Sequence, residues 1–336
     1  MKEARFWSPD NSKVKCDLCA RHCVVAQNHA GVCGVRVNEN RKLITKNYGL
    51  AAPIKVDPIG KKPLFHFYPE SLVLSLGTAG CNFKCDYCQN YDLSQSKMDE
   101  VQSRKVTPKK IQAMAKRNRC EGIAWTYNEP TIWYEFVHDA ARFLKRRGLF
   151  NVFITNGYIE KEPFVELSSY LDAVNVDIKA FSDEFYAKIS RAHLKPVLNT
   201  CKLAKELGLH IEISYLLVPP LNSNPQEIQK LSRWIFNILG KDTPLHFLRF
   251  FPMHRLTDIP TTPSEALVDA QRIAKLEGLT NVYINNLPGS KYQDTYCPNC
   301  GEILIHREDF FTILNRINDG KCPKCNAAVL MVGSKK

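Results

Sequence analysis

The sequence predicts an α/β fold: a partial (β/α) TIM-like barrel with small metal-binding extensions at its N- and C-terminal ends. The first observation behind this fold class is that strand-like and helix-like segments alternate from about residue 72 to residue 286. Repeated strand–helix units build a parallel sheet with right-handed crossovers. The second observation is that cysteines gather in groups of four, three and four, before, within and after this region.

Seven short apolar runs read as strands. Six or seven strand–helix units favour an open or partial barrel over a flat dinucleotide-binding sheet, and no GxGxxG fingerprint is present. We expect strands at Leu72–Leu76, Gly122–Thr126, Asn151–Thr155, Ala173–Ile178, His210–Val218, His246–Phe251 and Asn281–Asn285.

The segments between the strands carry helix start and stop signals. Thr107 is placed to cap a helix that begins at Pro108, because the fixed φ of proline suits the first helical position. A stripe of apolar residues with a 3.6-residue period runs from Thr131 to Arg147 and stops at Gly148. Three further helices are expected, from Pro196 to Leu207, from Pro225 to Leu239, and from Pro263 to the residue before Gly278.

The length of 336 residues suits one large domain with small appendages. We divide the chain into an N-terminal four-cysteine metal-binding extension (1–65), a barrel core (66–290) and a C-terminal four-cysteine zinc-ribbon-like domain (291–336). No run of about 18 apolar residues is present, and the N-terminus lacks the apolar segment of a signal peptide. We therefore expect a cytoplasmic protein with no membrane contact.

Thirteen cysteines in such a chain indicate metal sites rather than disulfides. Cys120 and Cys201 stand outside the three groups and are expected to be small, buried apolar residues. The net charge of +12 favours polyanions such as RNA, or acidic partners. The positive charges are scattered and no RNA-binding motif is present, so a basic solvated surface explains them equally well.

The central cysteine group is Cys81-x3-Cys85-x2-Cys88. Three thiolates at this spacing can hold three irons of a cubane cluster and leave the fourth open, whereas clusters that only carry electrons normally have four cysteines. An open coordination position is where a metal site does chemistry. A zinc knuckle or a structural cluster completed from elsewhere is the competing interpretation. The group follows the first strand, where parallel α/β folds place their chemistry, and this favours the open cluster.

This spacing, with Tyr87 directly before the last cysteine, resembles the signature of radical S-adenosylmethionine (radical SAM) enzymes. The resemblance implies a partial barrel of the radical SAM type and a [4Fe–4S] cluster whose open iron chelates S-adenosylmethionine. It implies that the reduced cluster cleaves this cofactor to a 5′-deoxyadenosyl radical. A reducing electron donor, flavodoxin- or ferredoxin-like, is implied as a partner.

Polar residues follow several strand ends, and in a parallel barrel these points share one rim. Glu129 and the backbone around Asn128 can accept hydrogen bonds from the cofactor amino group. Lys179 can neutralise its carboxylate, His254 can reach the ribose or carboxylate, and Tyr87 can flank the adenine. The rim residues are Asn128, Glu129, Thr155, Asp177, Lys179 and His254.

The chain is also similar to the pyruvate formate-lyase-activating-enzyme branch, and within that branch to the radical enzyme of the AmmeMemoRadiSam system. The likeness covers nearly the whole chain, although residues 327–332 lack the Gly and Trp that often end the AmmeMemoRadiSam type. The matching stretches are residues 57–67, 80–83, 88–90, 126–130, 154–157, 176–179 and 285–289.

The branch implies roles at matching positions. Residues 128–130 replace the Gly-Gly-Glu segment that meets the cofactor amine. Thr155 and Asp177 match positions that also help activating enzymes hold a monovalent cation, but Ile154 stands where those enzymes supply a carboxylate, which puts the cation in doubt. Memo-like and AMMECR-like proteins are implied as functional associates. Cofactor contacts are implied at Lys179 and His254.

The C-terminal cysteine group forms two CxxC knuckles around a strand-rich segment, and Gly301 supplies the tight turn after the first pair. This spacing is typical of zinc held by four cysteines. We favour structural zinc over an auxiliary cluster, because an appendage of about 40 residues needs a staple. The ligands are Cys297, Cys300, Cys322 and Cys325.

The N-terminal group, Cys16, Cys19, Cys23 and Cys33, fits zinc or a second cubane cluster. We favour zinc slightly; an auxiliary cluster would suit an electron relay or a second substrate-anchoring iron. His22 is expected to be a bystander, since four cysteines are available.

Three functions follow from these patterns. The first is hydrogen abstraction from a partner protein, as in an activating enzyme. The second is radical modification of RNA or a small molecule. The third, from another class, is a catalytically inactive, metal-stabilised adaptor for nucleic acid or protein, although an adaptor has no use for an ordered polar rim.

Overall fold

The computed structural model describes residues 1–287 and 291–333 and contains a central sheet of eight strands. Neighbouring strands from β9 to β16 run parallel, while β8 pairs antiparallel with β9 at one edge. Within the described residues no pairing joins β8 to β16, so the barrel is partial, as the sequence predicts. The strands, in sheet order, are β16 (Val282–Asn285), β15 (Leu245–Arg249), β14 (His210–Leu217), β13 (Ala173–Asp177), β12 (Phe150–Thr155), β11 (Gly122–Trp125), β9 (Leu72–Leu76) and β8 (Ile54–Pro58).

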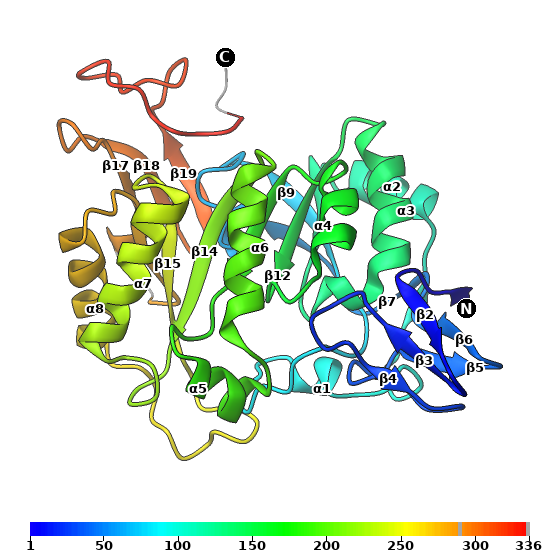
Figure 1. Ribbon diagram of the computed structural model, residues 1–336. Coiled ribbons are helices and arrows are strands. Elements are labelled where there is room, and N and C mark those ends of the chain that lie inside the picture. Colours follow the sequence, from blue (N-terminus) through cyan, green and yellow to red (C-terminus); the bar gives the residue numbers. More distant parts are fainter. Residues whose placement is uncertain (288–290, 334–336) are drawn as a thin grey trace.

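Helices cover the outer face of this sheet (Figure 1). The predicted cap is confirmed, because the Thr107 hydroxyl accepts a hydrogen bond from the Lys110 amide at 3.2 Å. A short helix that the sequence reasoning did not anticipate, α4, lies between β12 and β13. The helices are α2 (Pro108–Arg117), α3 (Tyr134–Lys145), α4 (Lys161–Ser168), α6 (Leu194–Glu206), α7 (Pro225–Trp234) and α8 (Ser264–Leu276), with the short α1 (Tyr91–Ser94) and α5 (Asp183–Phe185).

Short helical turns extend several of these helices. A 3-10 turn, η2 (Pro130–Trp133), leads into α3, and π turns continue α5 and α7 as η3 (Tyr186–Ser190) and η4 (Ile235–Leu239). Two more 3-10 turns are η1 (Ile59–Lys61) and η5 (Lys291–Gln293). In the described part of the chain, no helix is long and apolar enough to cross a membrane.

Small sheets occupy the two ends of the chain. The N-terminal strands lie at the same end of the barrel as α1 and α5, whereas the C-terminal strands lie at the opposite end (Figure 1). The sheets are β1-β6-β5, β2-β3-β4, β10-β7 and β17-β18-β19. Their bounds are β1 (Lys2–Glu3), β2 (Trp7–Asp10), β3 (Lys13–Cys16), β4 (Val24–Val25), β5 (Arg36–Glu39), β6 (Lys42–Thr45), β7 (Leu50–Ala51), β10 (Arg104–Lys105), β17 (Thr295–Tyr296), β18 (Ile303–Glu308) and β19 (Phe311–Asn315).

A fully buried carboxylate, Glu212, organises the amino end of the barrel. It accepts hydrogen bonds from the amides of Phe65 and His66 at 3.0 and 2.7 Å. It also accepts from Nε2 of His210 and of His246 at 2.8 and 2.7 Å. Burial alone would raise its pKa, but the two histidines outweigh burial and hold the pKa well below its usual range. The segment before β9 is thereby fixed to β14 and β15.

Next to Glu212, His66 is buried and joins this end of the barrel to the C-terminal segment. One ring nitrogen lies 2.7 Å from the Leu330 carbonyl oxygen, and the other lies 2.6 Å from the Tyr283 hydroxyl. Burial lowers the pKa of His66 to about 4. The imidazole is therefore neutral in the folded protein at pH 7.

We predict that the protein loses stability as the pH falls from about 6.5 to about 4. Between these pH values His66 is protonated in the unfolded chain but stays neutral in the folded chain. Acid therefore lowers the free energy of unfolding by up to about 3 kcal/mol. The thermal midpoint of the His66→Asn variant should fall less steeply with pH than that of the wild type. His29→Asn, at an exposed histidine, is the control and should keep the wild-type slope. Equal slopes for wild type and His66→Asn would contradict the prediction.

Candidate active site at the carboxyl ends of the strands

A cavity of about 420 Å³ opens at the carboxyl ends of the parallel strands. All but one of the predicted cluster and cofactor residues line it. The exception is His254, which instead stacks on Tyr91 with ring centroids 4.7 Å apart. The predicted residues that do line the cavity are Cys81, Cys85, Tyr87, Cys88, Asn128, Glu129, Thr155, Asp177 and Lys179.

The loop after β9 carries the three cysteines and is held from two sides. Gly80 adopts a φ of +89°, and a Cβ at this position would lie 2.3 Å from the Cys33 carbonyl oxygen, so only glycine fits. The Asn128 side chain donates to the Gly80 carbonyl at 2.7 Å. The amide of Phe83 donates to Cys81 Sγ at 3.4 Å. The backbone therefore aims the thiols into the cavity without help from a ligand.

Two of these thiols, Cys81 and Cys85, are buried, and burial raises the pKa of both. As free thiols they are poor nucleophiles, because the thiolate is the reactive form. Cys88 is half-buried, with its Sγ 3.1 Å from Ser94 Oγ. Three thiols that line one cavity suit metal ligation, in which a metal ion replaces the proton, better than thiol catalysis.

Glu129 is buried between the ends of β11 and β12. It accepts hydrogen bonds from the Thr131 amide at 2.9 Å, the Thr155 hydroxyl at 2.7 Å and the Asn156 amide at 2.7 Å. Burial raises its pKa, and these donors oppose the rise. Glu129 therefore links two strand ends and is also a polar group on the cavity wall. The Thr155 hydroxyl already donates its hydrogen to Glu129.

Asp177 and Lys179 form an ion pair at the end of β13, with Lys179 Nζ 2.8 Å from Asp177 Oδ2. Burial would lower the pKa of Lys179, but Asp177 and Cys85 outweigh burial and raise it. Lys179 therefore stays protonated at neutral pH, with Asp177 balancing its charge, and both residues line the cavity. The Lys179 ammonium has three N–H donors, so it can keep the bond to Asp177 and still donate to an anionic group of a ligand.

The cavity also contains residues to which the sequence reasoning assigned no role. Lys62 is buried against Asp57 Oδ2 at 2.7 Å, and burial lowers its pKa to about 8 despite this partner. Asn285 is fully buried, and its Oδ1 has no hydrogen-bond partner among the described residues. Both residues lie in stretches that carry the family resemblance, which is the signal that could have identified them. Asn285 belongs to the stretch 285–289, whose last residues, Pro288 and Gly289, lie outside the described residues.

Phe310 reaches the cavity from the C-terminal domain. It occupies the turn between β18 and β19 with a φ of 72°, and its carbonyl oxygen would lie 2.4 Å from a Cβ at Gly60. The buried Arg307 anchors the same hairpin by donating to the Phe65 carbonyl at 2.8 Å. The C-terminal domain is therefore part of the cavity wall, although its cysteine motif suggests only a separate staple.

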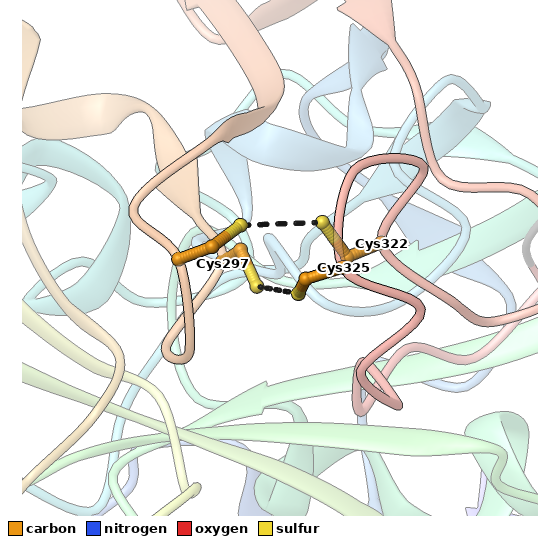
Figure 2. A group of neighbouring side chains, drawn as sticks. Cys297, Cys322 and Cys325 are labelled. Carbon is orange, nitrogen blue, oxygen red and sulfur yellow. Dashed lines mark hydrogen bonds between the residues drawn. The ribbon is translucent and has the colours of Figure 1, made fainter.

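The C-terminal cysteines face one another across two loops (Figure 2). The Sγ atoms of Cys297 and Cys325 lie 3.6 Å apart, and those of Cys300 and Cys322 lie 3.7 Å apart. All four sulfurs lie within 4.8 Å of one another, and no other group of three or more metal-binding side chains comes so close within residues 1–287 and 291–333. The predicted metal-binding group is thus assembled and is able to hold a metal ion.

The N-terminal quartet surrounds a smaller cavity. Cys16 ends β3, Cys19 and Cys23 lie in the loop before β4, and Cys33 precedes β5. All four cysteines line this cavity. The structure therefore brings together every cysteine group that the sequence predicts, and all thirteen cysteines are free thiols.

Comparison with known proteins agrees with this geometry. The chain is 46% identical over 335 residues to an uncharacterized protein of Methanocaldococcus jannaschii, which covers 99% of this chain and 100% of that one. It is 25% identical over 205 residues to the pyruvate formate-lyase-activating enzyme of Clostridium pasteurianum, across 59% of this chain and 85% of that one. A radical SAM methyltransferase from Sphaerobacter thermophilus shares the fold, with a TM-score of 0.52, 17% identity and coverage of 65% and 67%.

The model of the radical SAM superfamily matches residues 75–235, which contain the cysteine triplet and most of the polar cavity wall. Membership in this family implies a [4Fe–4S] cluster and S-adenosylmethionine. The chain belongs to the radical SAM superfamily.

Proposed function

We propose that Cys81, Cys85 and Cys88 bind a [4Fe–4S] cluster, and that S-adenosylmethionine occupies the adjoining cavity. The observation that carries this proposal is the location of all three thiols in one cavity that Glu129, Asp177 and Lys179 also line. When bound and reduced, the cluster supplies an electron that converts the cofactor into methionine and a 5′-deoxyadenosyl radical, which abstracts hydrogen from a substrate.

The residues of this chain have separate tasks in such a complex. Lys179 is charged at neutral pH and faces the cavity, which suits the cofactor carboxylate. The cofactor amine needs hydrogen-bond acceptors, and Glu129 and the backbone around Asn128 supply them. Tyr87 is buried beside the cysteines and offers a flat surface to the adenine. His254 stacks on Tyr91, which directly follows the cavity residue Asn90, and remains a candidate contact for the ribose or carboxylate.

For the substrate, we propose a protein, as in an activating enzyme. The support is the similarity to the Clostridium pasteurianum activating enzyme and to a putative glycyl-radical enzyme activating enzyme of Methanocaldococcus jannaschii, which is 26% identical over 215 residues. Memo-like and AMMECR-like proteins are the associates to test first, with a flavodoxin- or ferredoxin-like reductant. The inactive-adaptor hypothesis is disfavoured, because an adaptor has no need for a polar cavity beside three thiols.

For the C-terminal quartet, we propose structural zinc. A tetrahedral zinc ion with Zn–S bonds of about 2.3 Å places its sulfurs about 3.8 Å apart, close to the 3.6 and 3.7 Å found here. The ion would tie together two loops whose hairpin carries Phe310 into the active cavity.

The first prediction from this function concerns radical formation. Anaerobically reconstituted and reduced protein should convert S-adenosylmethionine slowly to 5′-deoxyadenosine, measured by mass spectrometry. The combined Cys81→Ser, Cys85→Ser and Cys88→Ser variant should form none, because no open iron remains. Cys120→Ser, which changes a cysteine outside the three groups, is the control and should retain the activity. Product from the triple variant would contradict the proposal.

A second prediction concerns cofactor affinity. Lys179→Met keeps most of the side-chain volume and removes the charge, and it should weaken S-adenosylmethionine binding by roughly 10- to 100-fold, as expected for loss of a charged hydrogen bond. Lys188→Met is the matched control, because Lys188 is exposed and pairs with Glu184 on the surface. Isothermal titration of the reconstituted protein measures both variants. Unchanged affinity in Lys179→Met would remove Lys179 from the cofactor site.

A third prediction concerns the C-terminal metal. Replacing Cys297 and Cys322 together by serine should remove about one zinc ion per chain and lower the thermal midpoint, since metal binding supplies part of the folding free energy of such small domains. Metal analysis by mass spectrometry and thermal unfolding of the same samples provide the test. Zinc content equal to that of the wild type would show that zinc binds elsewhere.

A further inference from the structure

The N-terminal quartet lies beside the active site, and its sulfurs do not have the spacing of the C-terminal quartet. Among the described residues, only Cys297, Cys300, Cys322 and Cys325 bring three or more ligand atoms within 4.8 Å of one another. Neither the N-terminal quartet nor Cys81, Cys85 and Cys88 forms such a compact group. Among the described residues, the sulfur spacing expected of a single zinc ion is thus found at the C-terminal quartet alone.

The N-terminal cysteines also border more free space than a single ion leaves. In a zinc site every sulfur lies about 2.3 Å from one point, so the centre has no room for a water-sized sphere. The four N-terminal cysteines instead line a cavity with about 20 Å³ of room, enough for such a sphere. In a cubane each thiolate binds a different iron at a different corner, which sets the sulfurs farther apart than one zinc ion does.

From this spacing, we propose that Cys16, Cys19, Cys23 and Cys33 bind a second cubane [4Fe–4S] cluster rather than zinc. Three of the four cysteines are buried, and Cys23 is half-buried, so the protein would shield the cluster from solvent. Four thiolates close every iron. The site therefore has no open position for substrate, unlike the triplet at Cys81, Cys85 and Cys88.

The residues around the quartet supply hydrogen-bond donors for a sulfur-rich anion. Arg36 lines the cavity with only 2% of its side chain exposed, and it pairs with Glu135 Oε1 at 3.1 Å. Arg36 Nε and Arg21 Nη2 are buried without a hydrogen-bond partner among the described residues. Arg21 also lines the cavity and donates through Nε to the Asn82 carbonyl at 2.8 Å. A cubane offers inorganic sulfides as well as thiolates to such donors, and hydrogen bonds to these sulfurs help to set its potential.

The proposed second site is in direct contact with the first. Gly80, which immediately precedes Cys81, packs so closely on Cys33 that a Cβ would lie 2.3 Å from the Cys33 carbonyl oxygen. Asn82, which follows Cys81, lines the N-terminal cavity, and its Oδ1 accepts a hydrogen bond from Asn156 of the active cavity at 2.8 Å. The two cysteine sites are thus separated by little more than one segment of backbone.

A closed cluster in this position suits electron delivery, a role that rests on the function proposed above. A flavodoxin- or ferredoxin-like protein would donate one electron to the N-terminal cluster and so reduce it. That cluster would then return to its oxidised state by passing the same electron to the cluster at Cys81, Cys85 and Cys88. No bond is made or broken in the transfer.

Metal content tests the site without relying on catalysis. The Cys81→Ser, Cys85→Ser, Cys88→Ser variant keeps the N-terminal quartet intact. Purified anaerobically, it should contain about four irons with matching sulfide and about one zinc per chain, and it should show a cubane spectrum by electron paramagnetic resonance after reduction. Iron-free protein with about two zinc ions would overturn the proposal. This variant cannot form the active-site cluster, so the result is independent of whether the proposed function is right.

The reciprocal variant covers the case in which the triple variant does not fold. Cys16→Ser, Cys19→Ser should drop from about eight irons to about four, and its remaining resonance should still change when S-adenosylmethionine is added. A wild-type protein with only about four irons, unchanged in this variant, would overturn the proposal.

Freeze-quench resonance tests the electron-delivery role in the same variant. Reduction of the remaining cluster by a flavodoxin should slow by an order of magnitude or more, while reduction by dithionite should keep its wild-type rate. Equal slowing with both reductants, or none with either, would refute the delivery role.

Discussion

The parallel register of the central strands is the constraint on which the site depends. Leu76 pairs with Trp125, Trp125 pairs with Phe153, and Thr155 pairs with Val176. Because the strands end nearly level, the segments that follow them leave the sheet at one edge and their polar side chains meet there. A shift of one residue in any of these pairings would turn the affected side chains to the opposite face. The cysteine loop, Glu129 and Asp177 would then no longer share a cavity.

Two buried carboxylates hold that register at opposite ends of the barrel. Glu129 ties the end of β11 to the end of β12, and Glu212 ties the start of β14 to β15 and to the segment before β9. An unpaired buried carboxylate costs several kcal/mol, so each is tolerable only because donors surround it. These donors are supplied by distant segments of the chain. Because each buried carboxylate needs these donors, the distant segments must take their places when the chain folds. The cavity is therefore formed before any ligand binds.

The sequence was a good guide where local patterns decide the structure and a poor one where long-range packing does. The seven parallel strands of the central sheet lie within one or two residues of their predicted bounds, because apolar runs between turn signals are local. The cavity-lining residues at strand ends followed from the fold class. The sequence did not indicate that Phe310 enters the cavity or that Lys62 is buried against Asp57, since both depend on contacts between distant segments. His254 follows β15 as expected, but it has a positive φ and stacks on Tyr91, and it is not among the residues that line the cavity.

Cysteine spacing illustrates the same limit in chemical terms. Both terminal quartets combine short loops of the kind that serve zinc and iron–sulfur clusters alike, so spacing along the chain does not discriminate between them. The distance at which the rest of the fold holds the cysteines of each quartet distinguishes a zinc site from an iron–sulfur site. At the C-terminus two knuckles face each other and their sulfurs nearly touch. At the N-terminus the Cys33 backbone packs closely against Gly80 in the loop that carries Cys81. The N-terminal extension is thus built onto the catalytic loop, and any group that it binds is held at a fixed place beside the active cavity.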